Sequence, residues 1–165
     1  MSERKNHTIS IKVTNKPGVL LRITTVFSRR AFNIDSLVVS PALDGHYSRL
    51  TLTVSGPQET LEQIIKQLNK LIDVIHASEH ETSNTIVAEL ALIKLHISKE
   101  KRNEVLQVAE HFKGQTVDFN DESLVLQLTG NTQKLDAAIA LLNDYNVVEI
   151  VRSGKLSMVR GKQET

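Results

Sequence analysis

The chain has 165 residues, of which 40% are hydrophobic and 24% charged, so it has the composition of one globular domain or of two domains of about 80 residues each. Twenty basic and 19 acidic side chains give a net charge of +1, which offers no bulk electrostatic reason to bind nucleic acid. The absence of cysteine excludes disulfides, thiolate nucleophiles and sulfur-ligated metals. We expect a cytoplasmic protein without membrane contact, because no apolar run reaches the ~20 residues of a span and no apolar segment follows the charged residues 1–7.

The first half of the chain alternates between the hydrophobic periods of strands and helices. Residues 8–14 alternate apolar and polar with a period of two, which predicts a half-buried strand. From Val19 the apolar residues follow the stripe of an amphipathic helix that ends near residues 31–33. The same reasoning predicts four further elements, namely strands at 37–40 and 50–54, a helix around 61–68 and a strand at 74–78. The order βαββαβ is that of a ferredoxin-like unit.

The second half repeats this order. The patterns predict a strand at 86–97, a helix around 105–112, a hairpin of strands 116–119 and 124–128, a helix around 135–142 and a strand at 147–151. The strand at 86–97 is apolar on both faces, so we expect both faces to be buried. Gly114 is the predicted C-cap of its helix, and Asn131 or Thr132 the predicted N-cap of the next.

Two tandem ferredoxin-like domains of the α+β class follow from these elements. We place the first domain at 1–80, a polar linker at 81–85 and the second domain at 86–165. Domains this small bury a modest share of their surface and leave sheet edges open. We therefore expect at least a homodimer.

The sequence does not nominate a catalytic or metal site. It has no G-x-S-x-G, P-loop or G-x-G-x-x-G motif, so no catalytic residues are expected. His76 and His80 stand four apart, but on a strand this places them about 13 Å from each other, and no metal is expected. RNA binding by the sheet would need aromatic residues on its outer face, where Ser10, Lys12, Thr51 and Thr53 are expected instead.

The turn Asn15-Lys16-Pro17-Gly18 is the most informative local motif. It joins a strand directly to a helix N-terminus, where the first N–H groups lack intrahelical partners and carry partial positive charge. Gly18 allows another backbone or a ligand to approach closely. Such a place suits a carboxylate, although a tight turn without any ligand explains the same residues.

Longer motifs resemble a known family. The words Asn15-Lys16-Pro17-Gly18-Val19-Leu20 and, within 27–37, Asn33-Ile34-Asp35-Ser36-Leu37 resemble the ACT domain of the small regulatory subunit of acetolactate synthase (acetohydroxyacid synthase). The run 61–74 (LEQIIKQLNKLIDV) and Arg152-Ser153-Gly154 are similar to the same family. The match runs in order through nearly the whole chain.

The resemblance implies a regulatory function in branched-chain amino-acid biosynthesis. A subunit of this family has no catalytic residues or cofactor of its own. It activates a large catalytic subunit, which carries thiamine diphosphate, Mg²⁺ and FAD and condenses two pyruvates, or pyruvate and 2-oxobutyrate, with loss of CO₂. It also confers feedback inhibition by valine. The partners implied are a second copy of this chain, the large subunit and valine, with neither nucleic acid nor membrane.

The resemblance also implies where valine binds, at the interface of two ACT domains. The valine carboxylate would meet the backbone N–H groups around Gly18 and Val19, with Asn15 hydrogen-bonding the ligand. Many relatives have a small or acidic residue where this chain has Lys16-Pro17, and Pro17 should stiffen the turn without blocking its amides. A small apolar pocket with Leu20 and Ile34 would take the isopropyl group, and Asn33 and Ile34 of the partner's second strand would close the site.

Two other functions fit the same sequence. One is an independent ACT-type module that senses another amino acid for another enzyme, which co-purification with a thiamine-dependent synthase would exclude. The other is an acylphosphatase-like enzyme on a ferredoxin-like fold, which an acyl-phosphate hydrolysis assay would detect.

Overall fold

The structure is a computed structural model that describes residues 5–80, 84–162 and 165. It divides into two compact units, one comprising Met1–Ile86 with Lys155–Thr165 and the other Val87–Gly154. The last segment therefore groups with the first unit, whereas the sequence reasoning assigned it to a second domain at 86–165. The functional division into domains at 1–80 and 86–165 stays a prediction.

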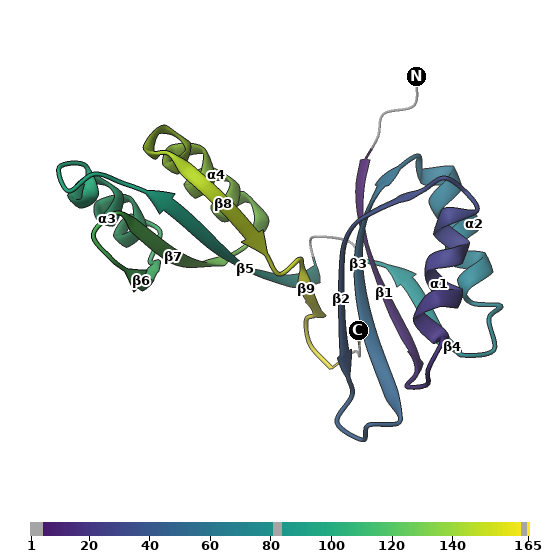
Figure 1. Cartoon of the computed structure of the whole chain (residues 1–165). Coiled ribbons are helices and arrows are strands. Elements are labelled where there is room, and N and C mark those ends of the chain that lie inside the picture. The colour runs from purple at the N-terminus through teal and green to yellow at the C-terminus, as the bar shows by residue number, and fades with distance from the viewer. Residues whose placement is uncertain (1–4, 81–83, 163–164) are drawn as a thin grey trace. The chain divides into compact units, whose positions relative to one another are not determined.

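The first unit is a four-stranded antiparallel sheet with two helices on one face (Figure 1). Its elements are β1 (Lys5–Thr14), α1 (Val19–Ser28), β2 (Asn33–Pro41), β3 (Tyr47–Gly56), α2 (Gln58–Leu68) and β4 (Val74–Glu79). The strand order is β2-β3-β1-β4, so β2 and β4 are edges. Val19, Ile23 and Phe27 of α1 are buried against the sheet, as the helical spacing of these residues predicts.

The second unit has the same order of elements. They are β5 (Thr85–His96), α3 (Arg102–His111), β6 (Gln115–Phe119), β7 (Ser123–Gly130), α4 (Thr132–Leu142), a 3₁₀ turn (Asn143–Tyr145) and β8 (Val147–Arg152). The antiparallel sheet has the order β6-β7-β5-β8. A further short strand, β9 (Leu156–Val159), pairs with β5. The predicted fold class, two tandem βαββαβ units of the α+β class, is confirmed.

Two local predictions differ from the structure, and a third, which left two residues open, is decided by it. The prediction that β5 is buried on both faces was wrong: Ala91, Ile93 and Leu95 are fully buried, but Leu92 is 36% exposed, because helices cover only one face of this sheet. Gly114 is not the left-handed residue that ends α3. Lys113 takes that conformation with φ 54°, and the Gly114 amide closes the turn by donating to Ala109 O at 2.7 Å.

The structure also decides between the two residues predicted as the N-cap of α4. Asn131 is its N-cap, with Oδ1 accepting from the Lys134 amide at 2.9 Å. Gly114 still has a packing reason to be glycine, because a Cβ there would lie 2.3 Å from Leu128 Cδ2.

Equivalent glycines end β3 and β7, and they offer a matched pair for testing the packing. A Cβ at Gly56 would lie 2.3 Å from the ring of Phe32, a buried side chain. A Cβ at Gly130 would have as its three nearest neighbours atoms of the flexible Lys134 side chain, the closest being Cδ at 2.5 Å. We expect Gly56→Ala to lower the free energy of unfolding of the first unit by about 1–3 kcal/mol and Gly130→Ala to cost the second unit less. Hydrogen exchange of core amides, read unit by unit, measures both, and equal losses would contradict the packing described here.

Candidate functional site

The turn between β1 and α1 is fixed to the neighbouring β2–β3 turn. The Asn15 backbone amide donates to His46 O at 2.8 Å, and its side-chain Nδ2 donates to Gly45 O at 3.1 Å. Asn15 therefore uses its side-chain N–H to hold two turns together. Its predicted contact with a ligand would fall to the carboxamide oxygen.

Gly18 is the N-cap of α1 and adopts the left-handed conformation, with φ 81° and ψ −9°. This conformation is the reason for glycine at this position, because other L-residues pay a steric cost there. The Val19 amide, which the resemblance assigned to the valine carboxylate, donates to Lys16 O at 3.4 Å. The amides of Gly18, Leu20 and Leu21 have no hydrogen-bond acceptor among the residues that the structure describes. Three donors at the positive end of a helix are thus available to an anion.

A small cavity of about 120 Å³ lies beside these amides. It is an open recess lined by five apolar and four polar residues of β1, the β1–α1 turn, α1, β2 and β3: Val13, Thr14, Asn15, Lys16, Val19, Leu20, Val39, Ser48 and Leu50. Of its lining residues Val19 is buried, whereas Leu20 is 43% exposed. The arrangement offers an anion site next to a short apolar recess.

Asn33 and Ile34 lie at the other end of the sheet. Asn33 pairs with Ser55 of β3, while the β1 end next to the turn pairs with Ser48. Ser48 and Ser55 are about 23 Å apart along the strand. A single chain therefore brings Asn15, Gly18, Val19 and Leu20 together but leaves Asn33 and Ile34 far from them.

Sequence reasoning missed part of the cavity lining. Val13, Val39, Ser48 and Leu50 belong to it because β1, β2 and β3 lie next to one another in a particular register. Their alternation along each strand was visible, and it marks Val13 and Leu50 as core residues. The cross-strand register that places them beside the turn was not readable from one sequence.

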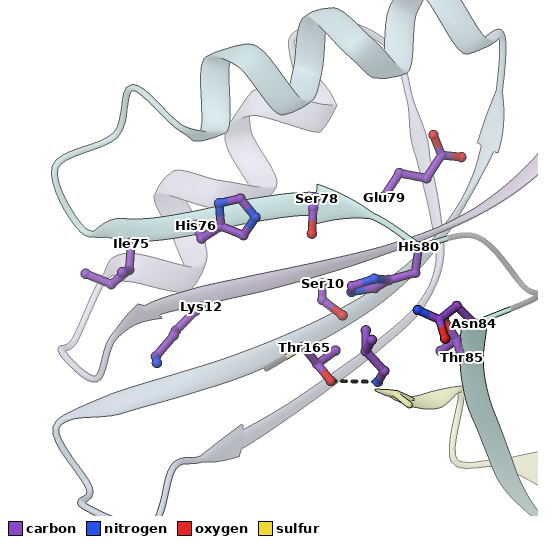
Figure 2. Close-up of a pocket in the computed structure, with 11 residues that line it drawn as sticks. Ser10, Lys12, Ile75, His76, Ser78, Glu79, His80, Asn84, Thr85 and Thr165 are labelled. Atoms are coloured by element: carbon purple, nitrogen blue, oxygen red, sulfur yellow. Dashed lines mark hydrogen bonds between the residues drawn. The ribbon is translucent and has the colours of Figure 1, made fainter. Parts of the chain in front are cut away.

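A second, larger cavity of about 540 Å³ lies on the outer face of the first unit's sheet, opposite the helices. Figure 2 shows the ring of His80 beside the hydroxyl of Ser10, and the Thr165 hydroxyl accepting from the backbone amide of Val159 at 2.9 Å. Ser10, Thr51 and Thr53, which the alternation predicted to face outward, are only 4–7% exposed. Residues of the C-terminal segment pack on this face, with Ser157 Oγ 3.5 Å from Ser10 Oγ, and this packing explains the difference.

Burial of His80 lowers its pKa below the ordinary 6.5, and the nearby His76 and Arg49 lower it further. Between the lowered pKa and 6.5 the unfolded chain binds more protons than the folded one, so the folded state loses stability as the pH falls through this window. We expect His80→Gln to show a smaller loss of urea stability between pH 7.5 and 5.5 than the unmodified chain. His96→Gln, an exposed histidine of the second unit, is the control. An unchanged pH dependence in His80→Gln would contradict the assignment.

The described residues contain no group of three or more His, Asp or Glu side chains that could hold a metal ion. No helix in the described ranges is both long and apolar enough to cross a membrane.

Comparison with known proteins decides the family. The family model for the "AHAS small subunit-like ACT domain" matches residues 9–76, and that for the "small subunit of acetolactate synthase" matches residues 88–161. The chain is 42% identical to a probable acetolactate synthase small subunit of Archaeoglobus fulgidus, over 96% of this chain and 99% of the relative. The chain belongs to the family of acetolactate synthase small subunits.

Further relatives agree with the assignment. The chain is 44% identical to the acetolactate synthase small subunit of Mycolicibacterium smegmatis, over 94% of this chain and 91% of the relative. The crystal structure of the acetolactate synthase small subunit from Thermotoga maritima matches with a TM-score of 0.85 and 36% identity, covering 96% of this chain and 99% of that one. The family resemblance carried by the sequence words is thus confirmed, and the first unit contains the ACT domain. As an acetolactate synthase small subunit, the chain has a regulatory role and partners a large catalytic subunit.

Proposed function

We propose that this chain activates the large subunit of acetolactate synthase and makes it sensitive to valine, which binds at the β1–α1 turn. The observation that carries the proposal is the set of three amides without acceptors beside a small apolar cavity. The amides can receive the valine carboxylate, and the recess can receive the isopropyl group. A pocket of this kind separates side chains that differ by one methylene by only ~1–3 kcal/mol, so leucine and isoleucine should bind more weakly.

The ammonium group of valine needs an acceptor as well. The Asn15 carboxamide oxygen, on the side chain that already joins the two turns, is suited to accept from it. A hydrogen bond to a charged group is stronger than one between neutral groups and would fix the orientation of the ligand.

The proposed site is completed by a second copy of the chain. β2 is an edge strand, so it can pair with the β2 of another copy. An antiparallel pairing about a two-fold axis near Leu37, the middle residue of β2, would set the partner's Asn33 end against Pro41. Pro41 pairs with Ser48, which borders the cavity. The same Asn33 and Ile34 that lie far away within one chain would then close the site of the other.

Valine would act by linkage. It can change the activity of the large subunit only by binding one arrangement of the small-subunit dimer more tightly than another. A ligand held by two chains is suited to this, because its affinity depends on how the two ACT domains are placed. The valine-bound arrangement would activate the large subunit less than the free one.

Reconstitution with a large subunit tests the proposal. The large subunit is supplied with thiamine diphosphate, Mg²⁺ and FAD in a buffer of cytoplasmic pH and ionic strength. Acetolactate formation is measured for the large subunit alone, for the large subunit with this chain, and for both with valine. We expect activation by the chain and its partial reversal by valine, with no valine effect on the large subunit alone. Activation without any valine effect would contradict the sensing role.

A further inference from the structure

Three large apolar side chains of the first unit are more exposed than any other large apolar side chain in the part of the molecule that the structure describes. Leu43 is fully exposed, Ile72 is 94% exposed and Leu21 is 70% exposed. Leu43 lies in the turn between β2 and β3, Ile72 in the turn between α2 and β4, and Leu21 near the start of α1. Scattered exposed hydrophobic residues are ordinary on a protein surface, whereas several at one place mark an interaction site.

The three positions share one end of the unit, the lower end in Figure 1. The end of β1 is bonded to both neighbouring turns. The Thr14 amide donates to Asp73 O at 2.9 Å in the α2–β4 turn, and the Asn15 amide donates to His46 O at 2.8 Å in the β2–β3 turn. Arg22 joins α1 to the same Asp73 at 2.5 Å. These bonds fix the turns relative to one another, so a partner that binds here has less motion to arrest.

Leu21 faces directly away from the core. Val19, Ile23 and Phe27 form the buried stripe of α1. Successive residues of an α-helix are rotated by about 100°, which places Leu21 opposite the middle of that stripe. Its side chain therefore does not help to fold this unit, and contact with another protein gives it a physical reason to be apolar.

The proposed dimer does not cover this whole surface. β2 is the edge strand that would pair with a second copy, whereas Ile72 lies just before β4, the opposite edge of the sheet. With β3 and β1 between them, β2 and β4 are about 14 Å apart. The other protein that this chain binds, as an acetolactate synthase small subunit, is the large catalytic subunit.

The apolar side chains have polar neighbours at the same end of the unit. Lys16 of the β1–α1 turn, Asp44 of the β2–β3 turn and Lys70, which follows α2, are all exposed. An apolar centre within a polar, solvent-accessible rim is the usual anatomy of a protein–protein interface. The surface is thus built for a protein partner that offers apolar recesses.

We propose that this end of the first unit docks on the large catalytic subunit, with Leu21, Leu43 and Ile72 as its apolar contacts. The inference rests on the proposed activation of that subunit and names the surface that delivers it. The docking surface adjoins the proposed valine site, which opens toward β2 where Val39 lines the recess. Asn15, proposed to hold valine, also donates to Gly45 O in the turn that carries Leu43. Valine would therefore act on the docking surface directly.

Titration of the large subunit with this chain, in the absence of valine, tests the docking surface. Leu21→Gln, Leu43→Gln and Ile72→Gln replace exposed apolar side chains with polar ones of similar size, so the fold should be unaffected. Each should raise the concentration of chain that gives half-maximal activation about tenfold, the effect of losing one strong interface contact. Leu141→Gln, an exposed leucine on α4 of the second unit, is the matched control and should leave this concentration unchanged.

Photo-crosslinking identifies the occupant independently of activity. The chain has no cysteine, so Leu43→Cys and Ile72→Cys each accept a photoreactive thiol label at one position. In the assembled enzyme both should give an adduct with the mass of one large and one small subunit, and labelled Leu141→Cys should not. Adducts that contain only small subunits would assign the surface to a second copy and overturn the proposal.

The docking surface and the proposed function fail in different ways. A chain that neither binds nor activates the large subunit would refute the proposed function and this surface together. Normal activation by the unmodified chain, with unchanged half-maximal concentrations for all three glutamine variants, would refute the surface alone. Because valine is absent from these experiments, an error in the valine site does not change their result.

Discussion

Gly18→Asp is expected to abolish the response to valine while leaving activation of the large subunit intact. The new carboxylate would stand next to the amides of Leu20 and Leu21, where the carboxylate of valine is proposed to bind. Like charges brought together at a binding site cost several kcal/mol, so the valine concentration for half inhibition should rise at least about a hundredfold. Arg22 already pairs through Nη2 with Asp73 at 2.5 Å, so its remaining N–H donors offset the new charge only in part.

Gly18→Asn is the matched control. Asn and Asp have the same size, and both tolerate the left-handed conformation better than other non-glycine residues. A Cβ at this position has room, since its nearest neighbour is Arg22 Nη1 at 3.5 Å. Both variants should therefore lose similar stability, while Asn keeps most of the valine response. Full valine sensitivity in Gly18→Asp, or an equal loss in both variants, would show that the ligand carboxylate lies elsewhere.

Mixing two defective chains should restore part of the valine binding. In the proposed dimer each site takes its turn from one chain and Asn33 from the other. A heterodimer of Gly18→Asp with Asn33→Ala then has one site with an intact turn and an intact Asn33, and one site with both defects. Random pairing of equal amounts should return about a quarter of the original high-affinity sites.

The parent variants serve as controls for this mixture. Gly18→Asp alone should bind no valine, and Asn33→Ala alone should bind it about tenfold more weakly, because one hydrogen bond to a charged ligand is lost. Asn33 Nδ2 donates to Asp35 at 2.7 Å, so circular dichroism must show that the fold survives its removal. Calorimetry counts the sites. A mixture with no high-affinity sites would show that Gly18 and Asn33 do not meet across a dimer.

The periodicity of the sequence was sufficient to predict the order and the type of the helices and strands. The helical spacing of Val19, Ile23 and Phe27, all buried in the structure, and the alternation of β1 are local properties that burial imposes directly. The turn at Asn15–Gly18 was also readable, because a strand followed at once by a helix leaves few conformations for the residues between. The reason for Gly18, its φ of 81°, is of the same local kind.

Other features depend on partners far away in the chain and were beyond local reasoning. Lys113 takes a left-handed conformation that a glycine would adopt more easily. Position 114 is a glycine because a Cβ there would collide with Leu128. The outer face of the first sheet was expected to be solvated, yet residues more than 100 positions later pack on it. That Lys12 lies opposite Arg49 and His76 became visible only with the register of three strands.

A calorimetric titration of valine into this chain assembled with its large subunit tests the central claim most directly. Assembly supplies any contact with the large subunit that the site needs. The absence of heat would then mean that the chain does not bind valine. The account predicts saturable binding at one site per small-subunit chain, with leucine and isoleucine weaker and no binding to the large subunit alone. An assembly that is activated but binds none of the three amino acids would contradict it.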